Sequence, residues 1–411
     1  MKNVRDPIKM LEKVKRNQFK KMFILLMAMN PIVSGCWDRV EINDLAIVTA
    51  AAIDKKDNNQ IELSLQVFIP KSMGSGGGQG GPSQGGGVAT TLVRTEIGSN
   101  ISDALSKLQS KIPRKIFWGH CKVIIFGEQL AKEGIQEQLD FLLRDPQPRE
   151  RANVYVSEGK AKPILESEPP LESYSAKVLK ELSELHIGML VPLQKLDEML
   201  TGKPQGAALP FIKILPPEKG EKNLQGIPYI VGTAVFKKDK MTGTMTEKET
   251  RGLLWLRDEM ESYTVSIKPK GVKGEISLSP VSAQIKIIPQ IINDKWKLLV
   301  KVNTEGSVIQ NETNLNLSNP NSIKVAEEAY KKGIEKRILL AFRQTQQKKA
   351  DILGLGKEFY RKYPNQFNKV ESQWNEVFAK MEVEIDVNAN IRRQGYINKP
   401  AGLSENEVKD K

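Results

Sequence analysis

The sequence of 411 residues is poor in the residues that most often carry metal and redox chemistry: it has two cysteines, Cys36 and Cys121, and two histidines, His120 and His186. A structural zinc site needs about four Cys or His ligands close together, so these dispersed residues predict none. Acylation of Cys36, argued below, would leave Cys121 unpaired, so no disulfide is expected within the chain. Aromatic residues make up only 6% of the sequence, which predicts a core of mainly Ile, Leu and Val.

The sequence also lacks a long hydrophobic run. A helix that crosses a bilayer needs about 20 apolar residues, whereas Met22–Met29 is a run of eight and no later run approaches transmembrane length. The net charge is +13, but residues 1–35 contribute +6 of it and the remaining +7 is spread along the chain. No zinc-finger, bZIP, RRM or helix-turn-helix pattern accompanies this charge, so we expect no nucleic-acid partner. A basic surface near anionic lipid headgroups explains the charge more simply.

The N-terminus has the layout of a lipoprotein signal. Lys20 and Lys21 precede the apolar run, and Ser34 and Gly35 lead directly into Cys36. A basic region, a short apolar region and small residues before a cleavage site are typical of secretory signals. The Cys36 thiol can then carry an S-diacylglycerol, and cleavage frees its amine for N-acylation, for example by palmitate. We therefore predict a signal peptide over residues 1–35 and lipid attachment at Cys36; a frayed N-terminal helix with a chance cysteine is the weaker alternative.

Residues 36–215 predict a mixed α/β domain. Two strands over 44–54 and 61–69 are expected to form a hairpin, because the second alternates apolar and polar residues and 57–59 favour a turn. Further strands and amphipathic helices follow to about residue 160, and 171–201 read mainly as helix, interrupted at Pro192. The Gly-rich segment 74–87 has no Gly-Lys-Ser/Thr after it and is predicted to be a flexible loop without phosphate chemistry.

Residues 226–397 predict an α+β domain with an antiparallel sheet and helices. A hairpin over 229–246 and further strands are followed by a long helix from 321 to about 349, shorter helices, and a final strand over 382–391. A division of the whole chain into three subdomains is an alternative. The tail 398–411 is expected to be disordered. The apolar stripe of the long helix is expected to consist of Val325, Ala329, Ile334, Ile338 and Phe342.

His120 and Cys121 are adjacent, but neighbours on a strand point to opposite faces, so they are expected not to form a catalytic pair. His186 lies on a predicted helix with no other Cys or His nearby and is interpreted as a structural residue. Asp351 is interpreted as a helix cap that accepts backbone N–H groups.

Glu382, Glu384 and Asp386 share one face of the final strand, as the ligands of a metal site could. Alternation with an apolar face predicts a solvated edge anyway, so we expect no metal site and no cofactor.

Five segments together resemble the Ger(x)C family, the lipoprotein subunits of nutrient germinant receptors in endospore-forming bacteria. They are SGCWDRVEINDLAIVTAAAIDK (34–55), GTAVFKKDKMTG (232–243), ETRGLLWLR (249–257), KKADILGLGKEFYRKYP (348–364) and VNANIRRQG (387–395). The Cys-Trp-Asp-Arg stretch at 36–39, followed by Glu-Ile-Asn-Asp-Leu-Ala at 41–46, is the most specific part of the resemblance. The long basic N-terminus departs from the family and leaves Met10 and Met22 as alternative starts.

The resemblance implies a subunit of a receptor complex, anchored by lipid to the outer face of the cell membrane or inner spore membrane. Its implied partners are a polytopic A-type subunit and a transporter-like B-type subunit. The alternative is an extracytoplasmic solute-binding lipoprotein that delivers a nutrient to a transporter. That class predicts two doubly wound lobes with a ligand cleft at the strand ends. The sequence offers no nucleophile–base pair or metal-ligand set, which disfavours the third option, a membrane-anchored enzyme, and we expect a non-enzymatic protein.

Overall fold

The computed structural model describes residues 18, 20, 21, 44–69, 91–220, 225–260, 263–393, 400–404, 407 and 408. Ala46–Lys411 forms one compact unit and Met1–Leu45 a separate one. The predicted signal peptide, apart from three of its residues, lies outside the described part, as do Cys36 and the Gly-rich segment 74–87. The disorder expected for 398–411 stays a prediction.

The strands of the described residues form two sheets, one of nine strands and one of four. The first sheet contains β1 (Leu45–Lys55), β2 (Ile61–Phe68), β3 (Thr91–Gly98), β4 (Lys115–Phe117), β5 (Val123–Gly127), β6 (Asn153–Ser157), β7 (Gly206–Leu215), β8 (Ile227–Lys237) and β9 (Lys240–Thr246). The second contains β10 (Val265–Ile267), β11 (Ile276–Ile292), β12 (Lys295–Asn311) and β13 (Glu382–Arg393).

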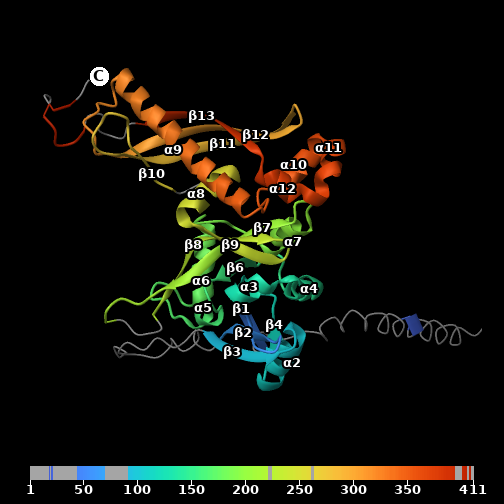
Figure 1. The fold of residues 1–411 in the computed structure, drawn as a ribbon. Coiled ribbons are helices and arrows are strands. Elements are labelled where there is room, and N and C mark those ends of the chain that lie inside the picture. The colour runs from blue at the N-terminus through green and yellow to red at the C-terminus, as the bar shows by residue number, and fades with distance from the viewer. Residues whose placement is uncertain are drawn as a thin grey trace, which may run out of the picture. The chain divides into compact units, whose positions relative to one another are not determined.

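Helices α2 to α12 all lie between β3 and β13 along the chain (Figure 1). They are α2 (Ile101–Lys111), α3 (Glu128–Glu133), α4 (Gln136–Arg144), α5 (Lys162–Glu166), α6 (Ser175–Glu184), α7 (Leu193–Thr201), α8 (Glu247–Leu256), α9 (Pro320–Gln347), α10 (Leu355–Lys362), α11 (Pro364–Val370) and α12 (Trp374–Ala379), with a 3-10 turn at Glu371–Gln373.

The first sheet is mixed, as the sequence predicts. Its strand order is β3-β2-β1-β5-β6-β7-β8-β9, with β4 beside β1. The central pairs β1–β5, β5–β6 and β6–β7 are parallel, and helices connect β5 to β6 and β6 to β7, as parallel strands require. The predicted hairpin of β1 and β2 is confirmed. Its turn residues Asn58 and Asn59 both have positive φ, which Asn tolerates better than most residues.

Alternate residues of the central strands pack into two separate cores, one on each face of the first sheet. On β5, Ile124 and Phe126 join a core with α2, α3, α4 and α7, whereas Val123 and Ile125 join a smaller core with α5 and α6. A strand covered on both faces should be apolar throughout, and β5 is buried along its whole length. The sheet is therefore a three-layer arrangement with helices on both sides.

The polar face of β2 is buried at two of its positions. Ser64 and Gln66 are at most 1% exposed. Gln66 Nε2 donates hydrogen bonds to the backbone oxygen of Leu165 and to Ser175 Oγ, both at 3.0 Å. Its Oε1 accepts a hydrogen bond from Thr49 Oγ1 of β1 at 3.1 Å. The side-chain amide is thus satisfied by β1, α5 and α6, so a polar side chain at this position marks a buried hydrogen-bond network and not an exposed edge.

The hairpin of β8 and β9, which the sequence analysis assigned to the second half, extends the first sheet. β8 pairs antiparallel with β7 from Gly206↔Lys237 to Leu215↔Ile227. The pairing crosses the segment in which the boundary between the predicted domains 36–215 and 226–397 lies. The larger core also continues from the first sheet into α8, α9 and the second sheet. This shared core accounts for the single compact unit of Ala46–Lys411.

The second sheet has the order β10-β11-β12-β13 and carries the expected helices. Its long β11–β12 hairpin turns at Asn293 and Asp294, both with positive φ, as two-residue hairpin turns of type I′ require. The expectation of an antiparallel sheet is correct for β10, β11 and β12, whereas β13 runs parallel to β12. Helices α9–α12 between β12 and β13 supply the long crossover that a parallel pair needs.

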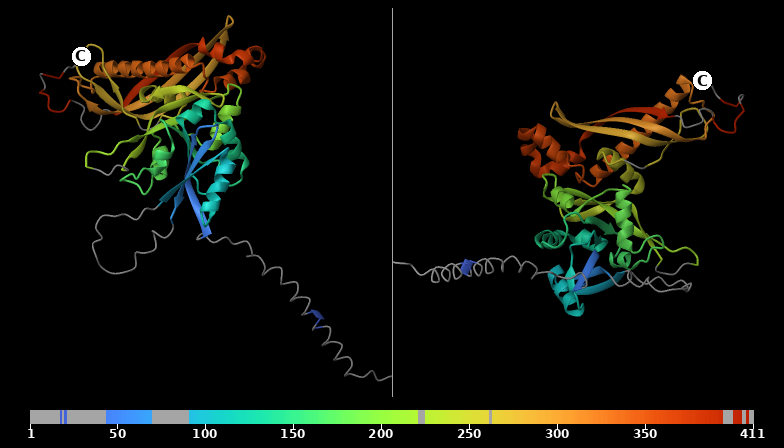
Figure 2. Two further views of the ribbon diagram at one scale, coloured as in Figure 1. Left: turned by 60° about the horizontal axis from the view of Figure 1, so that its bottom comes forward. Right: turned by 180° about the vertical axis from the view of Figure 1, so that it is seen from behind.

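Helix α9 runs along the second sheet, packing on β10 and β13 and against α8 (Figures 1 and 2). The Asn319 side chain caps it by accepting from the Asn321 N–H at 2.8 Å. Helices α10, α11 and α12 gather near the turn of the β11–β12 hairpin, where Trp296 packs with its ring centroid 5.0 Å from Phe359 and 5.6 Å from Trp374. This aromatic cluster fixes the helices against the hairpin.

Candidate functional site

The residue that the sequence singles out most strongly, Cys36, lies outside the described residues. β1 begins at Leu45, so the attachment point precedes the first described strand by a short segment. Lipid attachment at Cys36 therefore stays a prediction. The other candidates can each be placed.

The sequence analysis placed His120 and Cys121 on a strand, and this expectation is wrong. They lie in the turn between β4 and β5, where the Cys121 N–H donates to the Trp118 oxygen at 2.8 Å. His120 is exposed, and the Cys121 side chain is 1% exposed with Sγ 3.4 Å from the Val123 oxygen. Burial raises the pKa of the Cys121 thiol to about 12. A thiol with so high a pKa is a poor nucleophile, and the two side chains remain unfit for catalysis.

We expect Cys121 to resist alkylation in the native protein. At pH 8 a pKa of about 12 leaves roughly one thiol in ten thousand ionised, so iodoacetamide should modify this cysteine about a thousandfold more slowly than in the unfolded chain. Mass spectrometry of the peptide that contains Cys121, with and without urea, measures the two rates. Equal rates would mean that the thiol is accessible and ionisable in the folded state.

Asp351 accepts N–H groups at the start of a helix, as predicted, but it is not the N-cap residue: it lies three residues before Gly354, the N-cap of α10. Asp351 is 0% exposed, and its carboxylate accepts hydrogen bonds from Leu355 N–H at 3.0 Å, Gly356 N–H at 2.7 Å and Trp374 Nε1–H at 2.9 Å. Burial raises its pKa, and these hydrogen bonds oppose the rise. All of its contacts serve the start of α10 and the position of α12, so its role is structural.

A second buried carboxylate, Asp54, follows the same pattern. It is 2% exposed at the end of β1 and accepts from the Ala161 and Lys162 N–H groups at 2.7 and 2.9 Å. Burial raises its pKa, and the two backbone hydrogen bonds oppose the rise. Asp54 thereby satisfies the first N–H groups of α5. The sequence analysis did not single it out, because its partners are more than a hundred residues away.

The acidic residues of β13 lie on an exposed face, as expected. Glu382 pairs with Lys297 at 2.7 Å, and Glu384 and Asp386 are exposed. Among the described residues no group of three or more His, Cys, Asp or Glu is arranged to hold a metal ion. His186 lies after the end of α6 with φ +52°, not inside a helix. The described candidates lie in different parts of the fold: in the turn between β4 and β5, after α6, before α10 and on β13.

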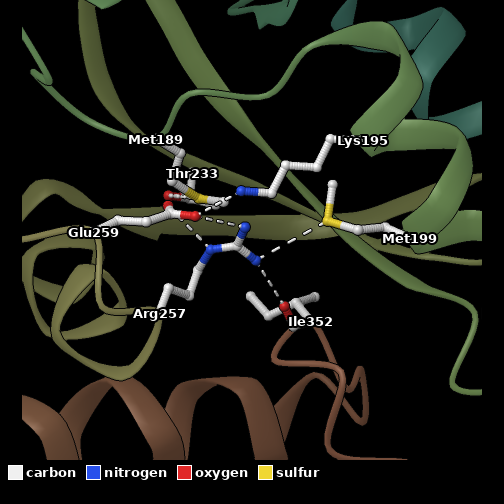
Figure 3. Close-up of polar contacts among 7 residues, drawn as sticks. All are labelled: Met189, Lys195, Met199, Thr233, Arg257, Glu259 and Ile352. Carbon is white, nitrogen blue, oxygen red and sulfur yellow. Dashed lines mark hydrogen bonds and ion pairs between the residues drawn. The ribbon is translucent and has the colours of Figure 1, made fainter. Parts of the chain in front are cut away.

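The structure instead assembles a polar junction that the sequence did not predict. Arg257, directly after α8, donates to both carboxylate oxygens of Glu259, from Nε at 3.1 Å and from Nη2 at 2.9 Å (Figure 3). Lys195 of α7 adds a third bond to Glu259 at 2.7 Å. Arg257 Nη1 also donates to the Ile352 oxygen at 3.2 Å, in the loop before α10. A planar guanidinium with bonds on both edges is well suited to fix three segments at once.

The electrostatics of this junction favour the charged form of Glu259. The side chains of Arg257 and Glu259 are 11% and 25% exposed. Burial opposes ionisation of Glu259, but the attraction and hydrogen bonds of Arg257 and Lys195 outweigh it and lower the pKa of Glu259. Because α7 covers the first sheet and the Ile352 loop leads into the helices of the second, the junction ties the two sheets together.

Two further contacts join the same segments. Lys203, after α7, pairs with Glu371 at 2.8 Å and lies 4.0 Å from the centroid of the Tyr360 ring. A Cβ atom on Gly206 would lie 2.5 Å from the Asp351 oxygen, so β7 can approach this loop closely only with glycine there. The junction therefore consists of tight packing and ion pairs.

The described residues thus define a two-sheet α+β protein in which the buried ionisable groups serve as caps and junction contacts. Comparison with known proteins identifies the family. The family model of the spore germination protein N-terminal domain matches residues 38–214, and that of the spore germination B3/GerAC-like C-terminal domain matches residues 231–395. The chain belongs to this family of spore germination proteins, and the resemblance found in its sequence is confirmed.

Its relatives match along nearly their whole length. Spore germination protein KC of Bacillus subtilis is 30% identical over 400 residues, covering 93% of this chain and 97% of the relative. The putative spore germination protein YfkR of the same organism is 27% identical over 389 residues, covering 94% and 99%. The crystal structure of the GerBC protein superposes with a TM-score of 0.55 and 20% identity over 84% of this chain and 97% of that chain. The last comparison confirms the fold.

Proposed function

We propose that the protein is a lipid-anchored, non-enzymatic subunit of a nutrient germinant receptor and acts in spore germination. The observation that carries the proposal is the match to one germination family through both halves of the chain, from residue 38 to residue 395. Its partners would be a polytopic A-type subunit and a transporter-like B-type subunit. The protein would lie on the outer face of the cell membrane or inner spore membrane.

The anchor would be Cys36, carrying S-diacylglycerol and an N-acyl chain. The basic, apolar and small-residue segments that precede it support this assignment. Among the described residues, no helix combines the length and apolarity needed to cross a bilayer. A single acyl chain gives only weak attachment, of the order of 10⁴ M⁻¹, and two or more hold stably. The two acyl chains of the S-diacylglycerol would therefore suffice for retention, and the N-acyl chain would strengthen it.

The rival proposal, a solute-binding lipoprotein, fits the architecture less well. That class is built from two doubly wound lobes, each a parallel sheet with helices on both faces. The second sheet here is antiparallel over three of its four strands and carries one long helix along it. The core also continues from one sheet to the other, which argues against two lobes that open and close around a solute.

Replacing Cys36 by alanine is expected to release the protein from spore membranes and to abolish its contribution to nutrient-triggered germination. Spores that lack the gene and carry either variant are tested over a nutrient panel, with release of core solutes as the readout and a receptor-independent trigger as control. Washed membranes are probed for the protein in parallel. The matched control is Cys121→Ala, which removes the other cysteine and should stay anchored.

Full retention of Cys36→Ala in washed membranes would exclude the lipid anchor. A redundant receptor could mask the effect of the gene deletion, so the panel is repeated in a strain without related receptors. Normal responses of the deletion to every nutrient in that strain would contradict the receptor role. If the responses are normal there, saturable binding of a nutrient by the purified protein would favour the solute-binding alternative.

A further inference from the structure

A basic groove of about 1370 Å³ lies between α8, α9 and β10. Its α9 wall contains Val325, Ala329, Lys332, Lys336 and Leu340, which recur every three or four residues and so share one face of the helix. The opposite face of α9 packs into the core, with Ala326, Tyr330, Ile334 and Ile338 buried. Helix α9 therefore packs against the second sheet with one face and lines the groove with the other.

This second face explains why one expected core residue is not buried. Val325 was predicted to belong to the apolar stripe of the helix, but it is 38% exposed and lines the groove. Together with Ile267, Ala329, Leu339 and Leu340 it supplies apolar surface between the charged side chains. A groove that offers both apolar and charged surface is suited to an amphipathic occupant.

The charge of the groove is strongly unbalanced. Its lining includes nine Lys or Arg side chains and three Glu side chains. Each Glu is already paired with a basic neighbour: Glu247 with Arg251, Glu275 with Lys268 at 2.9 Å, and Glu328 with Lys332 at 3.0 Å. Six basic side chains remain that form no ion pair with any described carboxylate. They are Lys248, Lys270, Lys324, Lys336, Arg337 and Arg343.

Two arginines at the groove are incompletely paired in the described part of the chain: Arg337 has no carboxylate partner, and Arg251 pairs with Glu247 through Nη2 only. Among the described residues, Arg337 donates to the Gly333 and Ser266 backbone oxygens, at 3.2 and 3.4 Å, and to no carboxylate. Burial and, second, the neighbouring charge of Arg251 lower the pKa of Arg337. Arg251 Nε is buried without a hydrogen-bond partner in the described part of the chain. Carboxylates placed in the groove would satisfy these donors and relieve the repulsion.

The shape and size of the groove select the class of occupant. Pockets for small ligands measure about 300–1000 Å³, and this groove is larger. Its α9 wall runs from Lys324 to Arg343, which corresponds to roughly 28 Å of helix. A bilayer presents a flat surface and would not enter a groove between two helices and a strand. A helix with acidic and apolar faces would contact both the basic side chains and the apolar lining.

We propose that this groove binds an acidic amphipathic helix of another receptor subunit. The inference rests on the proposed receptor function and adds the surface through which the complex forms. The partner's apolar side chains would pack on Val325, Leu339 and Leu340, and its carboxylates would pair with Lys336, Arg337 and Arg343. Charge complementarity of this kind selects the partner and speeds association.

Site-specific photo-cross-linking in the intact receptor tests the groove. A benzoylphenylalanine residue replaces Leu340 in the full chain, the complex is irradiated in spore membranes, and the adduct is mapped by mass spectrometry. The control replaces Leu171, which is 83% exposed in the loop before α6. We expect the Leu340 probe to cross-link to an acidic amphipathic segment of a receptor subunit and the Leu171 probe not to reach that segment.

A charge reversal provides the second arm. The double variant Lys336→Glu and Arg343→Glu should reduce the Leu340 adduct about tenfold, because opposite charges at the interface become like charges. The matched control is Lys357→Glu with Lys369→Glu on α10 and α11, which makes the same change in net charge at exposed positions and should leave the adduct unchanged. Equal thermal stability of both variants checks that the fold is intact.

Several results would overturn the inference. A complex that is intact but gives no Leu340 adduct with a subunit, an adduct only on lipid, or an adduct on a segment without acidic residues would each exclude an acidic partner helix at this groove while leaving the receptor function in place. Failure of every receptor subunit to co-purify would reject the groove together with the function on which it rests.

Discussion

Replacing Asp351 by alanine is expected to lower the free energy of unfolding by about 3 kcal/mol, because three buried donors lose their acceptor and an unsatisfied buried donor costs roughly 1–3 kcal/mol. The three donors are the N–H groups of Leu355 and Gly356 and the indole N–H of Trp374. Part of this loss is offset, because alanine removes a carboxyl group whose charged form is disfavoured by burial, the effect that raises its pKa. Urea denaturation followed by tryptophan fluorescence measures the change.

The matched control for this substitution is Asp386→Ala. Asp386 is exposed on β13, and a surface substitution of this kind typically changes stability by less than about 0.5 kcal/mol. Equal unfolding midpoints for the two variants would show that the hydrogen bonds of Asp351 contribute little. A loss of helical circular-dichroism signal with a normal unfolding midpoint would mean that the carboxylate stabilises only the start of α10.

The second large effect is expected at Gly252, where α8 crosses α9. A Cβ atom on this residue would lie 2.2 Å from the Arg337 backbone oxygen and 2.8 Å from the Ala341 Cβ. Forcing an extra group into a packed contact typically costs about 1–3 kcal/mol, and the better helix propensity of alanine returns up to about 1 kcal/mol. Gly252→Ala should therefore destabilise the protein by about 2 kcal/mol.

Gly333→Ala on α9 is the control for the helix crossing. Its Cβ would lie 3.2 Å from the Arg337 guanidinium, which can move, and 3.3 Å from an Ile267 methyl group. We expect this variant to keep its stability within about 1 kcal/mol of the parent, since the gain in helix propensity offsets the tight contact. Thermal unfolding by circular dichroism compares the two. If Gly252→Ala were as stable as Gly333→Ala, the two helices would be free to separate at the crossing.

The local elements of this fold are well encoded in the sequence. The β1–β2 hairpin follows from alternation and from Asn58 and Asn59, and the Asn319 cap and the acceptor role of Asp351 follow from residue type and position. Each of these features depends on residues a few positions apart. Periodicity and capping rules therefore apply to them directly.

The features that were missed depend on pairing over long distances in the chain. The parallel alignment of β13 with β12 and the addition of β8 and β9 to the first sheet depend on which strand edges meet in the folded chain, and local patterns do not specify this. Arg257 meets Ile352, and Gln66 meets Ser175, only in the folded chain. The groove was missed for a similar reason: Val325 fits an apolar stripe equally well whether or not a sheet covers it.

The antiparallel pairing of β7 with β8 also limits how members of this family can be recombined. The two family models treat residues 38–214 and 231–395 as separate segments, yet ten residues of β7 are registered with β8 across that division. A chimera joined between them would have to match the backbone edges, side-chain pairs and shared core of two different parents. An exchange after β9, which leaves the nine-stranded sheet intact, keeps those edges with their native partners.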